Sequence, residues 1–182
     1  MTTFFTSDHH FGHENILKFQ SNTRRYSSIH EMNKEYTNKW NSQANEKDII
    51  YHLGDLTFGD PIPYLKYLNG QIKIIPGNHD KWSKKNKFKE LYSKHGKIEI
   101  LPLISVLKLD HIKQIIVLCH YPMYSWAHSF HGSWHLYGHC HKSVNPQFFT
   151  MHVGVDDWNG NLVSLDQVVN YMKRYEGRKI GV

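Results

Sequence analysis

The chain has 182 residues, 40% of them hydrophobic and 14% aromatic, so it can bury a core and is not a disordered polymer. Its 22 lysine and arginine residues exceed its 16 acidic residues, and the formal charge of +6 favours phosphorylated anions without singling out nucleic acid. No apolar stretch approaches the roughly 20 residues that cross a bilayer, and the N-terminus lacks a signal-peptide pattern, so we expect a cytoplasmic protein without membrane contact.

The first half of the chain predicts strands alternating with helices. In chain order we expect a strand at 2–7, a helix at 27–44, a strand at 48–53, a short helix at 61–68 and a strand at 72–75. The helix at 27–44 carries apolar residues at spacings of three and four, namely Ile29, Met32, Tyr36 and Trp40. That stripe predicts a face packed against the core.

The second half predicts mostly strands. We expect β segments at 103–109 and 113–119, strands at 134–137, 151–155 and 162–163, and a helix from 164 to about 175. Ser164 and Gln167 have the spacing of a capping box at the start of that helix. Helices and strands first, then mainly strands, predict a mixed α/β (α+β) protein with two packed mixed sheets, as one domain over 1–182.

Five polar motifs follow predicted strands. They are Asp8–His10, Gly54–Asp55, Gly77–Asp80, His120 and Gly138–His141. Strand ends in α/β sheets open into shared loops, so distant motifs can converge there. Asp8 and His10 are two residues apart, and in extended backbone both would point to the same side. Together the motifs supply carboxylates, one amide and several imidazoles, a ligand set suited to two adjacent divalent ions.

No single motif carries this interpretation. With 15 histidines in 182 residues, about one His-x-His pair is expected by chance, so His139 and His141 alone indicate nothing. Gly-Asp pairs are equally common. The tetrapeptide Gly77–Asp80 is far less frequent, and the specificity lies in all five motifs occurring in one order.

That order resembles the calcineurin-like metallophosphoesterase superfamily, whose pattern is D-x-H, G-D, G-N-H-[DE], H and G-H-x-H. The resemblance covers residues 8–141 and extends to small bacterial and phage members in its opening motif. It implies a four-layer α-β-β-α sandwich and a metal-dependent phosphoester hydrolase. By position, it implies one ion held by Asp8, His10, Asp55 and His141, and a second held by Asp55, Asn78, His120 and His139, with Asp55 bridging.

The resemblance also implies a mechanism. The nucleophile would be hydroxide bound by the two ions, and His79 would be the general acid that protonates the leaving oxygen. Asp80 is a candidate to orient or charge His79. Oxygen and imidazole ligands suit Mn²⁺, Fe, Zn²⁺, Co²⁺ or Ni²⁺, and the family favours Mn²⁺.

Other polar and aromatic residues allow two interpretations each. His13 and Asn15 either reach substrate oxygens or belong to a polar loop before the next helix. The pair Arg24–Arg25 is either solvated or binds a distal phosphate. The lysine-rich segment 81–97 is either a solvated face or a basic rim for substrate, and the aromatic residues from Tyr121 to Trp134 either stack a base or pack in the core or rim.

The choice of substrate rests on departures from the family's protein phosphatases. Their G-D-x-x-D-R-G block places a carboxylate three residues after the motif aspartate, where this chain has Phe58. We therefore expect a compact phosphodiesterase acting on a small or nucleotide-like substrate. The alternatives are a phosphomonoesterase, a nucleic-acid-binding protein with structural metals, or a catalytically silent regulatory module. Oligomeric state is left open.

Overall fold

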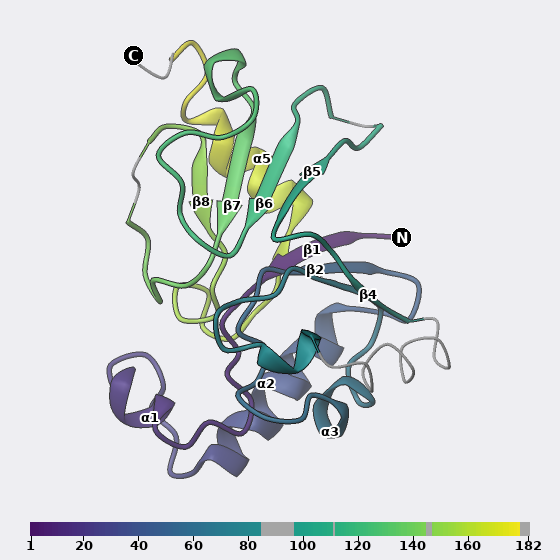
Figure 1. Cartoon of the computed structure of the whole chain (residues 1–182), viewed down its shortest axis with the longest axis vertical. Helices are drawn as coiled ribbons and strands as arrows, with labels where there is room; N and C mark the ends of the chain where they lie inside the picture. The colour runs from purple at the N-terminus through teal and green to yellow at the C-terminus, as the bar shows by residue number, and fades with distance from the viewer. Residues whose placement is uncertain (85–96, 111, 145–146, 179–182) are drawn as a thin grey trace.

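Two β-sheets pack together in a computed structural model that describes residues 1–84, 97–110, 112–144 and 147–178 (Figure 1). The first sheet contains, in spatial order, β4 (Ile98–Ile100), β3 (Gln71–Ile74), β2 (Ile49–His52), β1 (Thr3–Thr6) and β9 (Val163–Ser164). The second contains β5 (Ile104–Leu107), β6 (Ile116–Cys119), β7 (Trp134–Tyr137) and β8 (Thr150–His152). The predicted mixed α/β architecture with two packed mixed sheets is confirmed.

The strand directions bring loops from both sheets to one place. Strands β1 to β4 are parallel to their neighbours, and only β9 is antiparallel, pairing Phe5 with Val163. In the second sheet β6, β7 and β8 are parallel and β5 is antiparallel. The carboxyl ends of parallel strands meet at a common edge, so each sheet gathers the loops that follow its strands.

Helices cover the sheets. They are α1 (Ile16–Phe19), α2 (Ile29–Gln43), α3 (Ile62–Leu65) and α5 (Leu165–Lys173), with short 3₁₀ turns η1 (Lys81–Lys84) and η2 (Ser129–His131). The Ser28 side chain caps α2, and α5 starts with the predicted capping box of Ser164 and Gln167. Within the described ranges, every helix is too short or too polar to span a bilayer.

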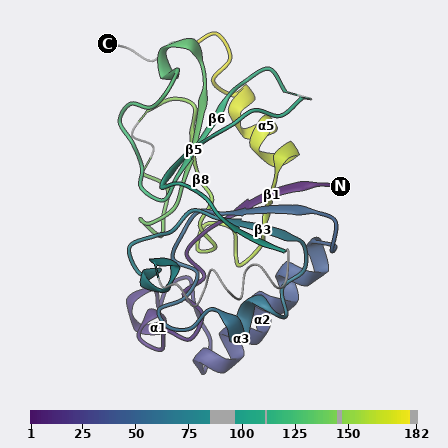
Figure 2. The same ribbon diagram turned by 45° about the vertical axis from the view of Figure 1, so that its right-hand side comes forward.

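The core has one hydrophobic cluster on each face of the first sheet. On one face Phe4 and Ile50 pack against α2, whose predicted stripe of Met32, Tyr36 and Trp40 is buried. The other face belongs to a cluster that also holds buried residues of β6, β7 and α5. Figure 2 shows α2 and α3 beneath the first sheet, and α5 beside the second. Burial of each large side chain stabilises the fold by about 1.5–3 kcal/mol.

Several strands end earlier than their sequence patterns predict. The segment expected at 2–7 is a strand only over Thr3–Thr6, and that expected at 151–155 is Thr150–His152. In both places the backbone leaves the sheet to form the loops that carry polar motifs. Strand β4 was not predicted, because three residues paired at a sheet edge are too short to show a periodicity.

Candidate metal centre

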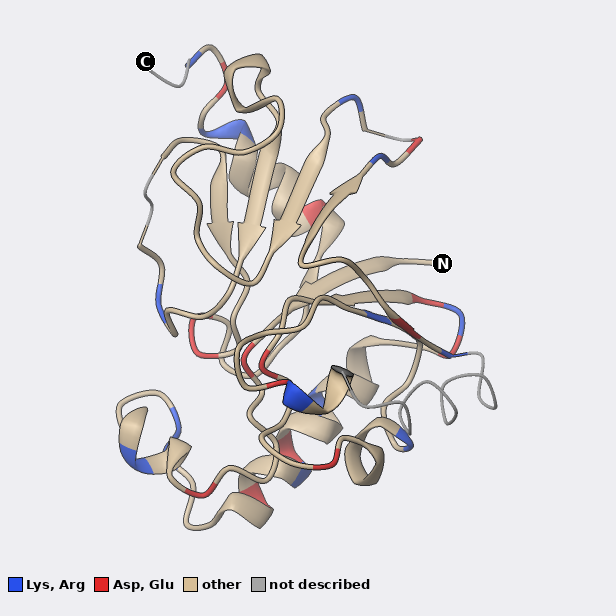
Figure 3. Ribbon diagram, viewed as in Figure 1, with Lys and Arg blue, Asp and Glu red and all other residues tan. Residues whose placement is uncertain are grey.

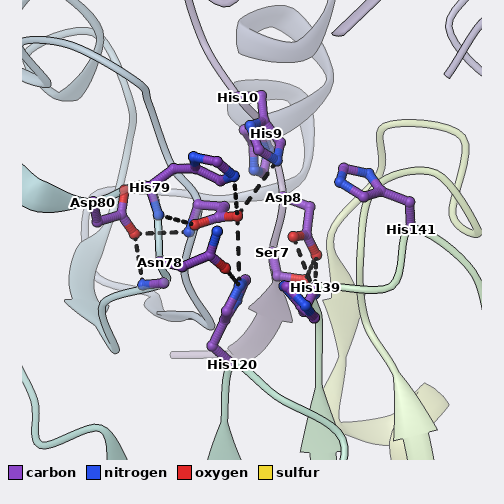
Figure 4. Close-up of polar contacts among 12 residues, drawn as sticks. Ser7, Asp8, His9, His10, Asn78, His79, Asp80, His120, His139 and His141 are labelled. Atoms are coloured by element: carbon purple, nitrogen blue, oxygen red, sulfur yellow. Dashed lines mark hydrogen bonds and ion pairs between the residues drawn. The ribbon is translucent and has the colours of Figure 1, made fainter. Parts of the chain in front are cut away.

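All seven residues predicted as ligands lie in loops that follow strands of the two sheets. Figure 4 shows six of them around one space, namely Asp8, His10, Asn78, His120, His139 and His141. Asp8, His10 and His141 offer ligand atoms within 4.8 Å of one another and form what we call the first triad. Asp55, His120 and His139 do the same and form the second triad. Each triad combines residues that follow strands of the first sheet with residues that follow strands of the second.

Asp55 belongs to the second triad and also faces the first. Its Oδ2 atom is 3.6 Å from Nε2 of His10 in the first triad and 3.4 Å from Nε2 of His120 in the second. Its Oδ1 atom accepts a hydrogen bond of 2.9 Å from the backbone N–H of His79. Burial alone would raise the pKa of Asp55, but the hydrogen bond and charge of His120 hold it below the usual value, so this carboxylate is ionised.

The arrangement around His120 fits a cation. Its Nδ1–H donates to the carbonyl of Leu53 at 2.7 Å, which leaves a lone pair on Nε2 in the neutral ring. That nitrogen lies 3.1 Å from Oδ1 of Asn78 and 3.4 Å from Oδ2 of Asp55, both of which are acceptors. Three lone pairs facing one point need a proton or a metal ion between them. Burial alone would lower the pKa of His120, but its hydrogen bond to Asp55 raises that pKa above the usual value. A proton on Nε2 is one of the two kinds of cation that this arrangement accepts.

His10 also fits a ligand role. Both of its ring nitrogens are buried without a hydrogen-bond partner, which is costly unless something binds them. Burial lowers its pKa to about 2, so the ring is neutral and can donate a lone pair. His10, His79 and His120 point toward the same central space (Figure 4). The residues of both triads therefore fit divalent cations, and acidic segments gather at this junction (Figure 3).

The backbone of the motif residues is left-handed, which the sequence argument did not anticipate. Positive φ angles occur at Asp8 (61°), His10 (51°), Asp55 (56°), His139 (69°) and His141 (54°). The expectation that Asp8 and His10 share one side of an extended strand was therefore wrong, because β1 ends at Thr6 and the chain turns at both residues. Such conformations cost on the order of 1–3 kcal/mol each and persist where surrounding contacts fix them.

Motif glycines allow the loops to approach closely. A Cβ atom on Gly54 would lie 2.6 Å from the backbone nitrogen of Gly77, and one on Gly77 would collide with the carboxylate of Asp55. Similarly, a Cβ on Gly138 would lie 2.5 Å from Oδ2 of Asp8. The glycines of three motifs are thus explained by contact between motifs.

Asp80 braces the loops around Asp55. Its carboxylate accepts backbone N–H bonds from Asp55 (2.7 Å), Leu56 (3.0 Å) and Gly77 (2.9 Å), and Trp82 Nε1 donates at 3.1 Å. Burial raises its pKa to about 6 despite these donors. Among the described residues, no hydrogen bond joins Asp80 to the His79 ring. Asp80 therefore holds the loop of Asp55 to the loop of Gly77 and does not orient His79.

An aromatic residue supports His79 instead. The His79 side chain is 37% exposed, and its Nε2 lies 4.0 Å from Oδ2 of Asp55. Its ring packs against Phe58 at 5.0 Å between centroids, and Phe58 in turn stacks on His13 at 4.7 Å. His13 also packs directly against the His10 ring, at 5.7 Å between centroids. Asn15, in contrast, is exposed and its side chain makes no cap hydrogen bond.

Arg24 does not belong to a solvated pair. It is 1% exposed, and its guanidinium binds the carboxylate of Asp156 through Nε (2.9 Å) and Nη2 (2.6 Å). Asp156 Oδ2 also accepts a 2.7 Å hydrogen bond from Nδ1 of His141. Asp156 was not predicted as a site residue, although it follows a predicted strand as the other motif residues do.

The aromatic residues after β6 divide into core and surface. Trp126 and Trp134 are buried, whereas Tyr121 is 44% exposed and packs against the rings of His120 (5.0 Å) and His139 (4.7 Å). Most of the lysine-rich segment, residues 85–96, lies outside the described part of the chain.

Comparison with known proteins gives concordant matches. The family model described as calcineurin-like phosphoesterase matches residues 1–176. An uncharacterised protein of Methanocaldococcus jannaschii is 32% identical over 183 residues, covering 94% of this chain and 91% of its own length. The gene 66 protein of Mycobacterium phage L5 is 27% identical over 210 residues, covering 96% and 97%. A solved structure of a protein of unknown function from Aquifex aeolicus has the same fold, with a TM-score of 0.71 at 21% identity, covering 93% of this chain and 98% of that one.

Proposed function

The chain belongs to the calcineurin-like phosphoesterase family, and from this premise we propose that it hydrolyses phosphodiesters with the help of two divalent metal ions. Family membership supports a metal-dependent phosphoester hydrolase. The observation that carries the finer proposal is the pair of triads with Asp55 Oδ2 within 3.6 Å of a histidine in each. A single carboxylate placed in this way can serve both ions.

The proposed ligands divide between two ions. Asp8, His10, Asp55 and His141 would hold one, and Asp55, Asn78, His120 and His139 the other. When bound, such ions lower the pKa of a shared water and neutralise charge on phosphoryl oxygens. Oxygen and imidazole ligands without thiolate suit Mn²⁺, which we propose as the working metal.

His79 is the proposed general acid. It is not in either triad, its side chain is partly exposed, and its Nε2 lies 4.0 Å from Asp55 Oδ2 at the edge of the cluster. A proton held on that nitrogen can pass to the leaving oxygen, an effect typically worth ~10²–10⁴-fold in rate. The Phe58 ring packs against the His79 ring at 5.0 Å between centroids.

Exposed aromatic rings favour a substrate with a planar group. Phe58 (55% exposed) contacts His79, and Tyr121 (44% exposed) contacts His120 and His139 of the second triad. Apolar rings exposed beside a polar cluster can stack a base or aryl group. We therefore propose a small, nucleotide-like diester as the substrate class.

The test is hydrolysis of bis-p-nitrophenyl phosphate and p-nitrophenyl phosphate with Mn²⁺, Zn²⁺ or a chelator. We expect faster turnover of the diester, loss of activity with the chelator, and loss of both metal and activity in Asp55→Ala. Asp166→Ala is the control, since it removes an exposed carboxylate on α5 outside both triads. Equal activity of Asp55→Ala and the wild type would reject the proposal. Preference for the monoester would indicate a phosphomonoesterase, and metal binding without turnover would favour a nucleic-acid-binding protein.

A further inference from the structure

We propose that Arg24 and Asp156 form a buried positioning pair that sets the geometry of the first triad alone, so that the affinity of one of the two ions depends on it. The inference rests on the proposed two-ion site. Neither residue belongs to a recognised motif, and the pair lies 132 residues apart in sequence.

Asp156 fixes the ring of His141. The 2.7 Å bond uses Nδ1 of His141, so Nε2 is the nitrogen available to an ion. The Asp156 side chain is fully buried and accepts further bonds from Arg24 and from Oγ1 of Thr23 at 2.6 Å. Because both oxygens are bonded in this way, the Asp156 side chain is held facing His141. Its negative charge makes the imidazole a stronger ligand for a metal ion.

Arg24 fixes the other part of the same triad. Its Nη2–H donates to the carbonyl of Asp8 at 2.6 Å and its Nη1–H to that of His9 at 3.0 Å. These carbonyls belong to the left-handed loop that carries Asp8 and His10. The N–H groups of that loop bond the carbonyls of Gly54 and Asp55, and Arg24 holds its carbonyl side. The planar guanidinium spans this loop and Asp156 together, which a lysine ammonium could not do. The pair therefore ties the loop after β1 to the loop after β7.

The second triad is supported differently. His120 is oriented by the backbone carbonyl of Leu53, a neutral group that no side-chain substitution removes. Among the hydrogen bonds of the described residues, none joins Arg24 or Asp156 to a member of the second triad. The two triads do touch, because the backbone N–H of His139 donates to the Asp8 carboxylate at 3.0 Å, but that N–H is not a ligand atom. Disruption of the pair should therefore weaken one ion and spare the other. A residue needed only for folding would affect both.

The experiment counts Mn²⁺ ions by calorimetric titration of metal-free protein and by elemental analysis after dialysis. In Asp156→Asn we expect one ion bound as in the wild type and the other bound ~10–100-fold more weakly, the usual effect of changing the partner of a ligand histidine. The matched control is Asp157→Asn, because Asp157 accepts a 2.8 Å bond from His152, a buried histidine outside both triads. That control should bind both ions normally.

A second variant covers the risk that Asp156→Asn does not fold. Arg24→Lys keeps the charge but lacks the fork, and it should produce the same selective weakening in protein whose circular dichroism is native. If either folded variant binds two ions with wild-type affinity, the inference is overturned and the proposed function stays intact. Equal weakening of the two ions has the same consequence. A wild-type protein that binds no metal would overturn both.

Discussion

The substitution Gly77→Ala tests whether close contact between motifs holds Asp55 in place. The added methyl would lie 2.5 Å from the backbone nitrogen of Asp55 and closer still to its Oδ1, whereas ordinary contacts begin at 3.4 Å, so the two loops must separate by at least about 0.9 Å. Neither can move easily, because Asp80 bonds the backbone N–H of both Asp55 and Gly77. Overpacking of this kind costs about 1–3 kcal/mol.

The displacement falls on the one carboxylate proposed to serve both ions. We therefore expect Gly77→Ala to bind both Mn²⁺ ions at least ~10-fold more weakly, in contrast to the selective effect of Asp156→Asn. The melting temperature of metal-free protein should fall by roughly 2–4 °C for each kcal/mol lost. Calorimetric titration and thermal unfolding measure the two effects separately.

Gly59→Ala is the matched control for this substitution. Gly59 follows the Gly54–Asp55 motif, which Gly77 contacts, but a Cβ atom on Gly59 would meet nothing within 4 Å, so affinity and stability should be unchanged. Wild-type Mn²⁺ affinity in Gly77→Ala would show that Asp55 is not held by this contact, or that it does not bind the ions.

Three further predictions concern His79, Phe58 and His135. His79→Asn should retain both ions but slow the hydrolysis of a diester with an alkoxide leaving group by ~10²–10⁴-fold. Hydrolysis of a p-nitrophenyl ester should slow far less, because only the alkoxide needs a proton. Equal losses of rate for both esters would contradict the role of His79 as general acid. Phe58→Leu should raise KM for thymidine 5′-p-nitrophenyl phosphate by about tenfold relative to methyl p-nitrophenyl phosphate, since only the former has a base to stack, and an unchanged ratio would remove Phe58 from substrate recognition. Burial lowers the pKa of His135 to about 4, and its neutral ring forms hydrogen bonds with the backbone of Val117 and Met123. Between pH 6.5 and 4 the unfolded chain therefore takes up a proton that the folded chain does not, and the free energy of unfolding should fall by about 3 kcal/mol because of His135. Urea titrations of metal-free His135→Gln should show a smaller decrease over the same pH range.

The sequence predicted the convergence of the site because its cause is local. Asp8, Asp55 and His120 each follow an apolar strand, and the ends of parallel strands meet at one edge whatever lies between them. The stripe on α2 and the capping box of α5 were predictable for the same reason, since spacing within one segment determines both.

Features that depend on distant contacts were not predictable. An arginine in a polar stretch looks solvated, and Arg24 is buried against Asp156, 132 residues away, which provides a carboxylate for it. The role of Asp80 depends on where the Gly54 and Gly77 loops meet, which no spacing reveals. The left-handed backbone at Asp8 and His10 is held by contacts that exist only in the folded chain, so the extended geometry assumed for that motif was wrong.

Each triad draws on both sheets, so on the proposed two-ion function the uptake of metal and the packing of the two sheets would be one thermodynamic event. An ion present at 100 times its dissociation constant would add about 2.7 kcal/mol to the closed form, and nothing to a chain whose halves have separated. A nascent chain would hold neither ion firmly until His139 and His141 had emerged from the ribosome. Starving a cell of metal would thus loosen the molecule and expose it to proteases, as well as silencing it.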